Sequence, residues 1–441
     1  MLPETMGEAP TKPGSGFHST RLSLPSLPLL LLLCCASEGA SSSVLVQLVA
    51  RDGEDPFEGA ATARVTLEAD EPIAFDPVPI DPAGEFEVDV DLSDAQAGAV
   101  RRARLEASDA DGEIVSRGST PLAPIGALAG FTIRLLVSPP ESAGSVTIPD
   151  LPPLRRAVPL LDQWILGLDG AGDLAMLDLL TYLPVRGMTP LDPVGPEARL
   201  VELGEGKVLL LGGGEDALVF DGAANGITTA EDGLEGASWR SPTVAAVPGG
   251  GALALCDGAD DLVVWDGQGA VLWDASLAAD REGCAAVAVG NRLVVYGGGS
   301  GDSPSAELVD LESRDVAILS ARSDRRRGSA AVARGERVFV LGGIDPDTGS
   351  PLGDGVRLDP SCDDGCPEPF ALGAPRASPV AIATEDEVLV AGDGTAELID
   401  LGSLATRPVA LPEAGEIAAG LLVSSGDVWL LGARAPIVYA P

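Results

Sequence analysis

The chain has 441 residues, of which 45% are hydrophobic and 4% aromatic, and it carries 67 acidic residues against 28 basic ones. This length exceeds one ordinary hydrophobic core, and the apolar content excludes a chain that is disordered by composition. The formal net charge of −39 is spread along the chain, so the surface repels phosphate backbones and anionic headgroups. We therefore expect no nucleic-acid partner and no electrostatic docking to a membrane.

Residues 1–40 form a predicted targeting segment. Lys12 and Arg21 precede an apolar run, Leu22–Leu33, that is too short to span a bilayer as a helix. The run ends at Cys34 and Cys35 and resembles the lipobox of bacterial lipoproteins. The resemblance implies lipidation of Cys34 or Cys35 and an exported, membrane-anchored protein of the bacterial cell envelope, either periplasmic or on the cell surface. Cleavage just after these cysteines, giving a secreted protein, is the alternative.

Residues 41–137 are predicted to form a separate β domain. Five segments show period-two alternation or β-branched enrichment: Val44–Val49, Ala63–Leu67, Glu85–Val90, Arg102–Ala107 and Phe131–Val137. Such a domain resembles an immunoglobulin-type or prealbumin-type sandwich. Carboxylates in the segment Asp109–Glu113 suit calcium, but the EF-hand loop is not completed and we expect a tight turn there. The proline-rich residues 138–153 are predicted to be a semi-rigid linker.

A sequence pattern recurs seven times in residues 154–441: an apolar strand, one to three glycines, a second strand and then usually an aspartate. Six of the repeats close with an aspartate: Asp178, Asp221, Asp266, Asp310, Asp359 and Asp400. These aspartates are separated by 43, 45, 44, 49 and 41 residues, and the seventh repeat has Ala440 at this position. A single small sheet cannot bury both of its faces, so units of this length gain a core by stacking radially into a ring. We therefore predict an all-β chain whose second domain is a seven-bladed propeller. Six blades are the alternative if the divergent first repeat belongs to the linker.

Diglycines follow apolar strands in the fourth and fifth repeats, at Gly297-Gly298 and Gly342-Gly343. Together with arginines at the repeat starts, these motifs resemble Kelch repeats and the seven-bladed domain of galactose-oxidase-like proteins. The resemblance implies a Kelch-like propeller over about residues 151–441. The copper chemistry of those relatives needs histidine, and the only histidine here is His18 in the targeting segment. We therefore expect no cofactor, no metal site and no imidazole-dependent catalysis.

Arginines recur at the start of successive repeats, where a closed ring would bring equivalent positions to one mouth. The set is Arg156, Arg199, Arg240, Arg281, Arg327 and Arg376. If their guanidinium groups converge, they could bind a carboxylate, a sulfate or an acidic sugar, and Arg240, Arg281, Arg327 and Arg376 are the candidate ligand-binding residues. The alternative is that each arginine pairs with an aspartate of its own or the adjacent blade and fixes the packing of the blades.

Four cysteines follow the targeting segment. Cys362 and Cys366 are predicted to close a short disulfide loop, as suits an oxidising compartment. Cys256 and Cys284 lie in adjacent repeats, and either a second disulfide or two buried thiols would satisfy them.

These features predict an exported envelope protein that binds a protein or a glycan through propeller loops and is not an enzyme. Its only contact with a membrane would be a lipid anchor. The alternative is a carbohydrate-active hydrolase or lyase with paired carboxylates in the propeller channel, one of them with a raised pKa.

Overall fold

A computed structural model describes residues 30–37, 40–80, 99–124, 132–188, 198–212, 217–230, 242–255, 260–299, 303–320, 324–362, 365–412 and 415–441. Regular structure in these residues is almost entirely β, which confirms the all-β class. No helix in the described ranges is long and apolar enough to cross a membrane.

The amino-terminal part contains two sheets. The first has the order β1-β2-β8, in which β1 (Leu30–Ser37) pairs antiparallel with β2 (Ala40–Ala50) and β2 pairs parallel with β8 (Thr132–Val137). The second contains β3 (Thr62–Glu68), β4 (Ile73–Ala74), β5 (Val78–Pro79), β6 (Arg102–Ser108) and β7 (Ile114–Ser119). Alternate residues of β3, β6 and β8 are buried in a shared apolar core, so the period-two pattern in the sequence identified three of these strands. The predicted strand at residues 85–90 lies outside the described residues.

Seven four-stranded antiparallel sheets follow, which we number as blades 1 to 7. Blade 1 contains β10 (Leu154–Leu160), β11 (Trp164–Asp169), β12 (Leu174–Asp178) and β13 (Leu183–Pro184). Blade 2 contains β14 (Arg199–Gly204), β15 (Lys207–Leu211), β16 (Leu218–Asp221) and β17 (Gly226–Thr229). Blade 3 contains β18 (Thr243–Ala246), β19 (Ala252–Leu255), β20 (Asp261–Trp265) and β21 (Val271–Ser276).

Blade 4 contains β22 (Ala285–Val289), β23 (Arg292–Tyr296), β24 (Ala306–Asp310) and β25 (Val316–Ser320). Blade 5 contains β26 (Ala330–Arg334), β27 (Arg337–Leu341), β28 (Leu352–Leu358) and β29 (Glu368–Arg376). Blade 6 contains β30 (Val380–Ala383), β31 (Glu387–Gly392), β32 (Thr395–Asp400) and β33 (Thr406–Val409). Blade 7 contains β34 (Ile417–Leu422), β35 (Val428–Gly432), β36 (Ile437–Ala440) and β9 (Ser142–Ser145).

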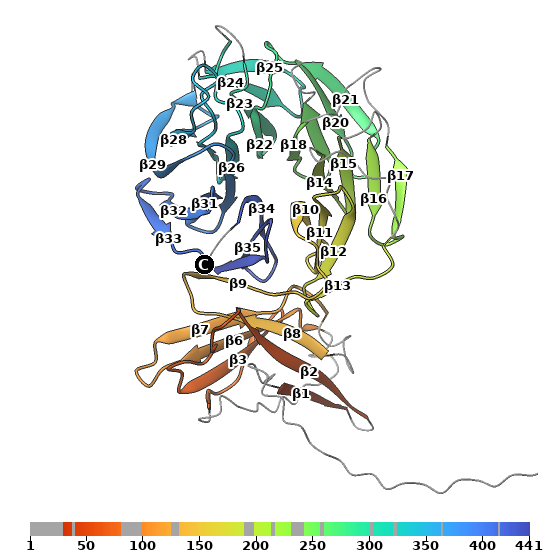
Figure 1. Cartoon of the computed structure of the whole chain (residues 1–441). Helices are drawn as coiled ribbons and strands as arrows, with labels where there is room; N and C mark the ends of the chain where they lie inside the picture. Colours follow the sequence, from red (N-terminus) through yellow and green to blue (C-terminus); the bar gives the residue numbers. More distant parts are fainter. Residues whose placement is uncertain are drawn as a thin grey trace, which may run out of the picture.

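The blades form a closed ring. Each innermost strand contacts the innermost strand of the next blade, and β34 of blade 7 contacts β10 of blade 1 (Figure 1). Apolar side chains of the inner strands pack between neighbouring blades, as in the shared cluster of β22 to β28. The arrangement is that of a β-propeller, in which stacking buries faces that a lone sheet would expose.

The ring is closed by a strand that precedes the first blade. β9 pairs antiparallel with β36, with Ser142 opposite Ala440 and Ser145 opposite Ile437. β9 lies within residues 138–153, which we expected to be linker throughout. Prolines flank this strand without interrupting it, so its N–H groups remain able to pair with β36.

The recurring aspartates lie at the end of the third strand, or directly after it, in each of the first six blades. In all six cases the side-chain oxygen accepts a hydrogen bond from the N–H two residues later, at Leu180, Ala223, Gln268, Glu312, Ser361 and Gly402. Each aspartate therefore shapes the turn into the fourth strand of its blade. Ala440 breaks the pattern because the fourth strand of blade 7 comes from elsewhere in the chain and no such turn follows.

Diglycines bring neighbouring blades into contact. Gly297 and Gly298 both have positive φ, and the Gly298 N–H donates to the Arg326 carbonyl of the next blade at 2.9 Å. A Cβ added to Gly297 would lie 2.3 Å from that carbonyl oxygen. Glycine is required here both by the left-handed backbone and by the close approach of the adjacent chain.

The amino-terminal domain packs against blades 1 and 7. Strand β8 lies between the two parts, because Ile133 and Leu135 belong to the amino-terminal core whereas Leu136 packs with Trp429 of the ring. The Arg134 N–H donates to the carbonyl of Leu180 in blade 1 at 2.6 Å. The two parts thus share an apolar interior.

Arg51 ties the amino-terminal domain to the closing strand. Its side chain is almost completely buried and donates to the Ser142 carbonyl at 2.9 Å, to the Ser142 hydroxyl at 2.8 Å and to the Val438 carbonyl at 3.4 Å. Glu54 pairs with its Nε at 2.8 Å. Both strands at the closure, β9 and β36, are therefore held by one guanidinium group.

Candidate functional site

The ring has two mouths, distinguished by the direction of the innermost strands. At the start mouth these strands begin, and adjacent blades meet there through the Gly328 N–H and the Gly283 carbonyl, at 2.7 Å. At the hairpin mouth the strands turn back, and adjacent blades meet through the Gly251 N–H and the Leu203 carbonyl, at 2.9 Å. Of the candidate ligand-binding arginines, Arg281, Arg327 and Arg376 lie at the start mouth, just before the innermost strands.

Arg281 and Arg376 are buried, and each pairs with a glutamate of the blade whose innermost strand follows it. The Arg281 and Glu307 side chains are both 0% exposed and form an ion pair, and the Arg281 Nη1 also donates to the Gly297 carbonyl at 2.9 Å. Arg376 pairs in the same way with Glu397 of β32. In each blade the second carboxylate oxygen accepts a backbone N–H three residues before the arginine, at Ala278 or Gly373. Both arginines are therefore paired within the fold, with glutamates where the alternative expected aspartates.

Arg327 is not the equivalent arginine in blade 5. Arg326 takes that place: it is buried, pairs with Asp324 and with Asp354 of β28, and donates to the Gly342 carbonyl at 3.2 Å. Arg327 is partly exposed and pairs with Glu282 of the preceding blade at 2.6 Å. Arg240 lies outside the described residues.

The cysteines are distributed over both domains. Cys362 and Cys366 are joined by a disulfide in the loop after β28. The Cys284 side chain is buried, with its Sγ 3.5 Å from the Thr243 hydroxyl, and Cys256 lies outside the described residues. Cys34 and Cys35 lie in β1, opposite Ser43 and Ser42 of β2. The described residues hold no group of three side chains suited to a metal ion, and the Asp109 carboxylate instead accepts the N–H groups of Asp111 and Glu113 in a turn.

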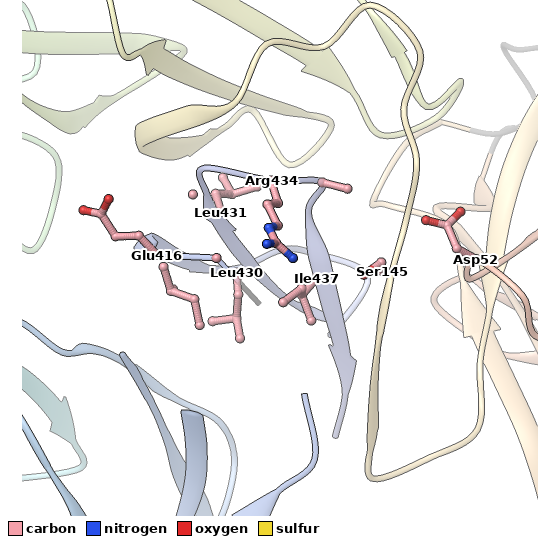
Figure 2. A pocket seen from close by; sticks show the side chains of 11 residues that line it. Asp52, Ser145, Glu416, Leu430, Leu431, Arg434 and Ile437 are labelled. Atoms are coloured by element: carbon pink, nitrogen blue, oxygen red, sulfur yellow. The ribbon is translucent and has the colours of Figure 1, made fainter. Parts of the chain in front are cut away.

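Two small cavities adjoin the turn between β35 and β36 at the start mouth. Their volumes are about 180 and 240 Å³, and both are lined by Leu431, Gly432, Arg434 and Ala435. Figure 2 shows the Arg434 side chain extending from this turn, with Glu416 on one side and Asp52 of the amino-terminal domain on the other. Each cavity is smaller than the ~300–1,000 Å³ typical of small-molecule sites.

Three exposed leucines, from both domains, lie on segments that meet at the hairpin mouth. Leu122, Leu161 and Leu422 are 37%, 40% and 42% exposed. Ser424 joins them, because its hydroxyl accepts the Leu122 N–H at 3.1 Å and donates to the Asp162 carbonyl at 2.6 Å. We call these three leucines, with Asp162 and Glu202, the hairpin patch.

Leu161 is presented on a strained turn. Leu161 and Asp162 have φ of 48° and 59°, and the Gln163 N–H donates to the Leu160 carbonyl at 3.3 Å. Two successive positive φ angles define a type I′ turn, where asparagine and glycine are strongly preferred. A bulky residue held there costs of order 1–3 kcal/mol, and such strain concentrates at functional sites. Gly206 of the next blade makes room for it, since a Cβ there would meet the Leu161 Cδ1 at 2.7 Å.

Carboxylates border the leucines. Burial and the nearby negative charge of Asp162 raise the pKa of Glu202, which lies on the innermost strand of blade 2. Asp162 and Glu205 are exposed, each in the hairpin turn of its blade. The patch therefore combines an apolar centre with an excess of negative charge.

A polar junction lies beside the patch, where the two domains meet. Arg102 donates to the Ser424 carbonyl, and the Ser119 hydroxyl donates to the Ser425 carbonyl at 2.5 Å. Burial raises the pKa of Asp427, although the Ser425 hydroxyl and nearby arginines of the amino-terminal domain oppose the rise. These contacts fix the position of Leu122 relative to the propeller turns.

Sequence reasoning missed the hairpin patch. The signal that was available is the dipeptide Leu161-Asp162, which occupies a two-residue turn between two apolar strands where asparagine and glycine are usual. Leu122 and Leu422 carry no comparable signal, because only the docking of the two domains places them next to Leu161.

The fold and the patch together define the class: a β-propeller with an appended β domain packed against its closing blade. No family model matches the chain, and no curated protein matches it. Solved structures do match; one is titled "Streptogramin B lyase structure", is 14% identical, and aligns over 67% of this chain and 95% of its own with a TM-score of 0.49. A likeness of this strength says nothing about the chemistry of this chain.

Proposed function

We propose that the protein is an exported binding protein of the bacterial cell envelope, with a β-sandwich followed by a seven-bladed, Kelch-like propeller. Its hairpin patch would bind an envelope protein or glycan without turnover. The observation that carries the proposal is Leu161, an exposed leucine kept on a type I′ turn at an energetic cost. Rigid blades that hold variable turns are a common way to build a binding surface.

The start mouth gives less support to a binding role. The guanidinium groups of Arg281, Arg326 and Arg376 are paired with carboxylates and hydrogen-bonded to carbonyls within the fold. A buried arginine paired in this way cannot turn to a ligand without leaving a carboxylate unpaired. The ligand surface is therefore better placed at the hairpin mouth.

We further propose that the protein reaches the envelope through its amino-terminal segment, anchored by a lipid on Cys34 or Cys35. Secretion without an anchor is the alternative. Mass spectrometry of the protein isolated from membranes distinguishes them, since a lipidated amino-terminal cysteine adds a diacylglyceryl mass that Cys34→Ser or Cys35→Ser removes.

The binding proposal is tested by comparing two leucine variants of the full chain. Leu161→Asn alters the patch, whereas Leu272→Asn alters a leucine that is more exposed but lies on the outer strand of blade 3. Both are screened against envelope glycans and solubilised envelope proteins. We expect a ligand that is lost with Leu161→Asn and kept with Leu272→Asn. Identical ligand profiles for the two variants would rule out the patch.

A carbohydrate-active hydrolase or lyase is the second candidate, favoured by one observation. Burial and the negative charge of Asp162 raise the pKa of Glu202, as expected for a general acid beside a second carboxylate. Product release from acidic and neutral oligosaccharides tests it. Turnover that falls by about a hundredfold or more in Glu202→Gln, with binding retained, would establish this function in place of simple binding.

A further inference from the structure

We propose that the hairpin patch docks a polypeptide segment that presents an arginine or lysine next to an apolar side chain. This inference rests on the proposed binding function and specifies the partner of the same surface.

The apolar half of the argument comes from the three leucines. Leu122, Leu161 and Leu422 come from the amino-terminal domain, blade 1 and blade 7. The Ser424 hydroxyl, two residues after Leu422, bonds to the Leu122 N–H and to the carbonyl of Asp162, the neighbour of Leu161. Hydrogen bonds across the domain junction hold these turns in place, so the patch is formed before a partner arrives. A preformed apolar centre lowers the entropic cost of docking an apolar side chain.

The charged half comes from the carboxylates around that centre. Asp162 and Glu205 are exposed, and the pKa of Glu202 is raised by burial and by Asp162. Arg102, a described cation close by, is mostly buried and is engaged with the Ser424 carbonyl and Glu68. A partner cation would relieve the repulsion between Asp162 and Glu202, so charge complementarity favours a basic segment.

A polypeptide fits the patch better than a sugar does. Protein interfaces combine an apolar centre with a polar rim, and arginine is enriched among their energetically dominant residues. The leucines supply such a centre, and Asp162, Glu202 and Glu205 supply an acidic part of the rim. Lys207, beyond Glu205, is engaged by the Gln268 side chain. An amino sugar would match the charge while leaving the leucines uncovered, and we treat its binding as an outcome of the test.

The test uses the full chain and short synthetic peptides in which leucine alternates with arginine, with glutamate or with glutamine. Titration calorimetry is run at low and high salt, with an oligomer of glucosamine as a further probe. We expect the arginine peptide to bind most tightly and to weaken at high salt. Equal binding of the glutamate peptide, or binding of the glucosamine oligomer alone, would overturn the proposal.

Two patch variants locate the binding, each with a matched control. Leu161→Asn should weaken the arginine peptide about tenfold, the range of an interface anchor, while Leu272→Asn should not. Glu202→Gln should weaken it about threefold and reduce its salt dependence, while Glu336→Gln on another hairpin turn should not. Equal effects of patch and control variants would refute docking at this surface.

The outcomes separate this inference from the function on which it rests. If an envelope ligand is lost with Leu161→Asn but the arginine peptide does not bind, the binding function stands and the partner chemistry is wrong. If neither depends on Leu161, both are wrong. Because asparagine suits the positive φ at this position, Leu161→Asn is expected to keep the fold, and its melting temperature checks this.

Discussion

At the residue scale, the recurring aspartates act as caps of turns. Hydrogen bonds from the Ser313 and Glu312 N–H groups lower the pKa of Asp310. Bonds from the serine hydroxyls of Ser361 and Ser403, and then from the N–H groups of these serines, lower the pKa of Asp359 and Asp400. A carboxyl group with a lowered pKa in the folded state stabilises the fold above its ordinary pKa. This contribution is lost as the pH falls through the lowered value.

Asp310→Ala should therefore lower the melting temperature at neutral pH, and the difference from the wild type should disappear in acid, where Asp310 is protonated. Asp310→Asn keeps an oxygen acceptor and should lose less. Thermal denaturation of the three proteins between pH 2 and 7 measures both effects. A constant difference across this range would mean that the carboxylate charge has no part in the turn.

Buried arginines give a second prediction at this scale. Arg281→Ala leaves Glu307 buried without its partner and should cost about 3–5 kcal/mol of unfolding free energy. Arg327→Ala removes a partly exposed pair with Glu282 and should cost less than about 1 kcal/mol. Urea denaturation compares them, and the double variant Arg281→Leu with Glu307→Leu should recover most of the loss. A similar cost for both single variants would contradict this account.

In blades 4 to 6 the repeat spacing located the buried arginine to within one residue but not its orientation. Arg156 and Arg199 instead lie within β10 and β14. Arg326 and Arg327 are adjacent, and only contacts with Asp324 and Asp354 decide which one points into blade 5. Spacing fixes where a strand starts, whereas the side chain that is buried depends on the partners that the next strands supply. For the same reason the buried Glu307 and Glu397 could not be singled out from the many acidic residues.

At the scale of elements, sequence patterns predicted the inner strands well, because these are apolar runs ended by glycine or aspartate. They did not predict the closing strand β9. Its sequence, Ser142–Ser145, has no apolar alternation, and its pairing with β36 depends on ring geometry. Ala440 in place of the seventh aspartate was a signal of this arrangement, since it shows that no turn to a fourth strand follows.

The closure should depend on Arg51. Arg51→Ala removes a charged donor from the Ser142 and Val438 carbonyls and leaves a cavity beside Gly144, so we expect a loss of about 2–4 kcal/mol. Hydrogen exchange should rise mainly in β9 and β36. Arg104→Ala, which removes an exposed partner of Glu68, serves as the control and should leave exchange in these strands unchanged.

At the scale of the whole molecule, the two domains are expected to unfold together. Leu180 of blade 1 lies in the core of the amino-terminal domain, and Leu136 of that domain lies in the core of blades 1 and 7. An interface of this kind couples the stabilities of the parts that share it.

Tryptophan fluorescence can report this coupling, because the chain's five tryptophans all follow the amino-terminal domain. Leu105→Ala in the core of that domain should cost about 2–5 kcal/mol and shift the fluorescence transition of the propeller. As a control, Arg64→Ala on the exposed face of β3 should not shift it. A transition that stays in place with Leu105→Ala would show that the domains unfold independently.

The position of β9 has a consequence for synthesis. Arg51 and the Val438 carbonyl that it binds are 387 residues apart. The amino-terminal domain, which leaves the ribosome first, therefore completes its contacts with the ring only after blade 7 has been synthesised. Contacts at such separation form slowly, and until then the edge of β9 is unpaired. A copy that stops short of Ile437 would have six complete blades but an open ring. A quality-control protease that recognises exposed strand edges would therefore detect an unfinished copy at β9, far along the sequence from the missing strand.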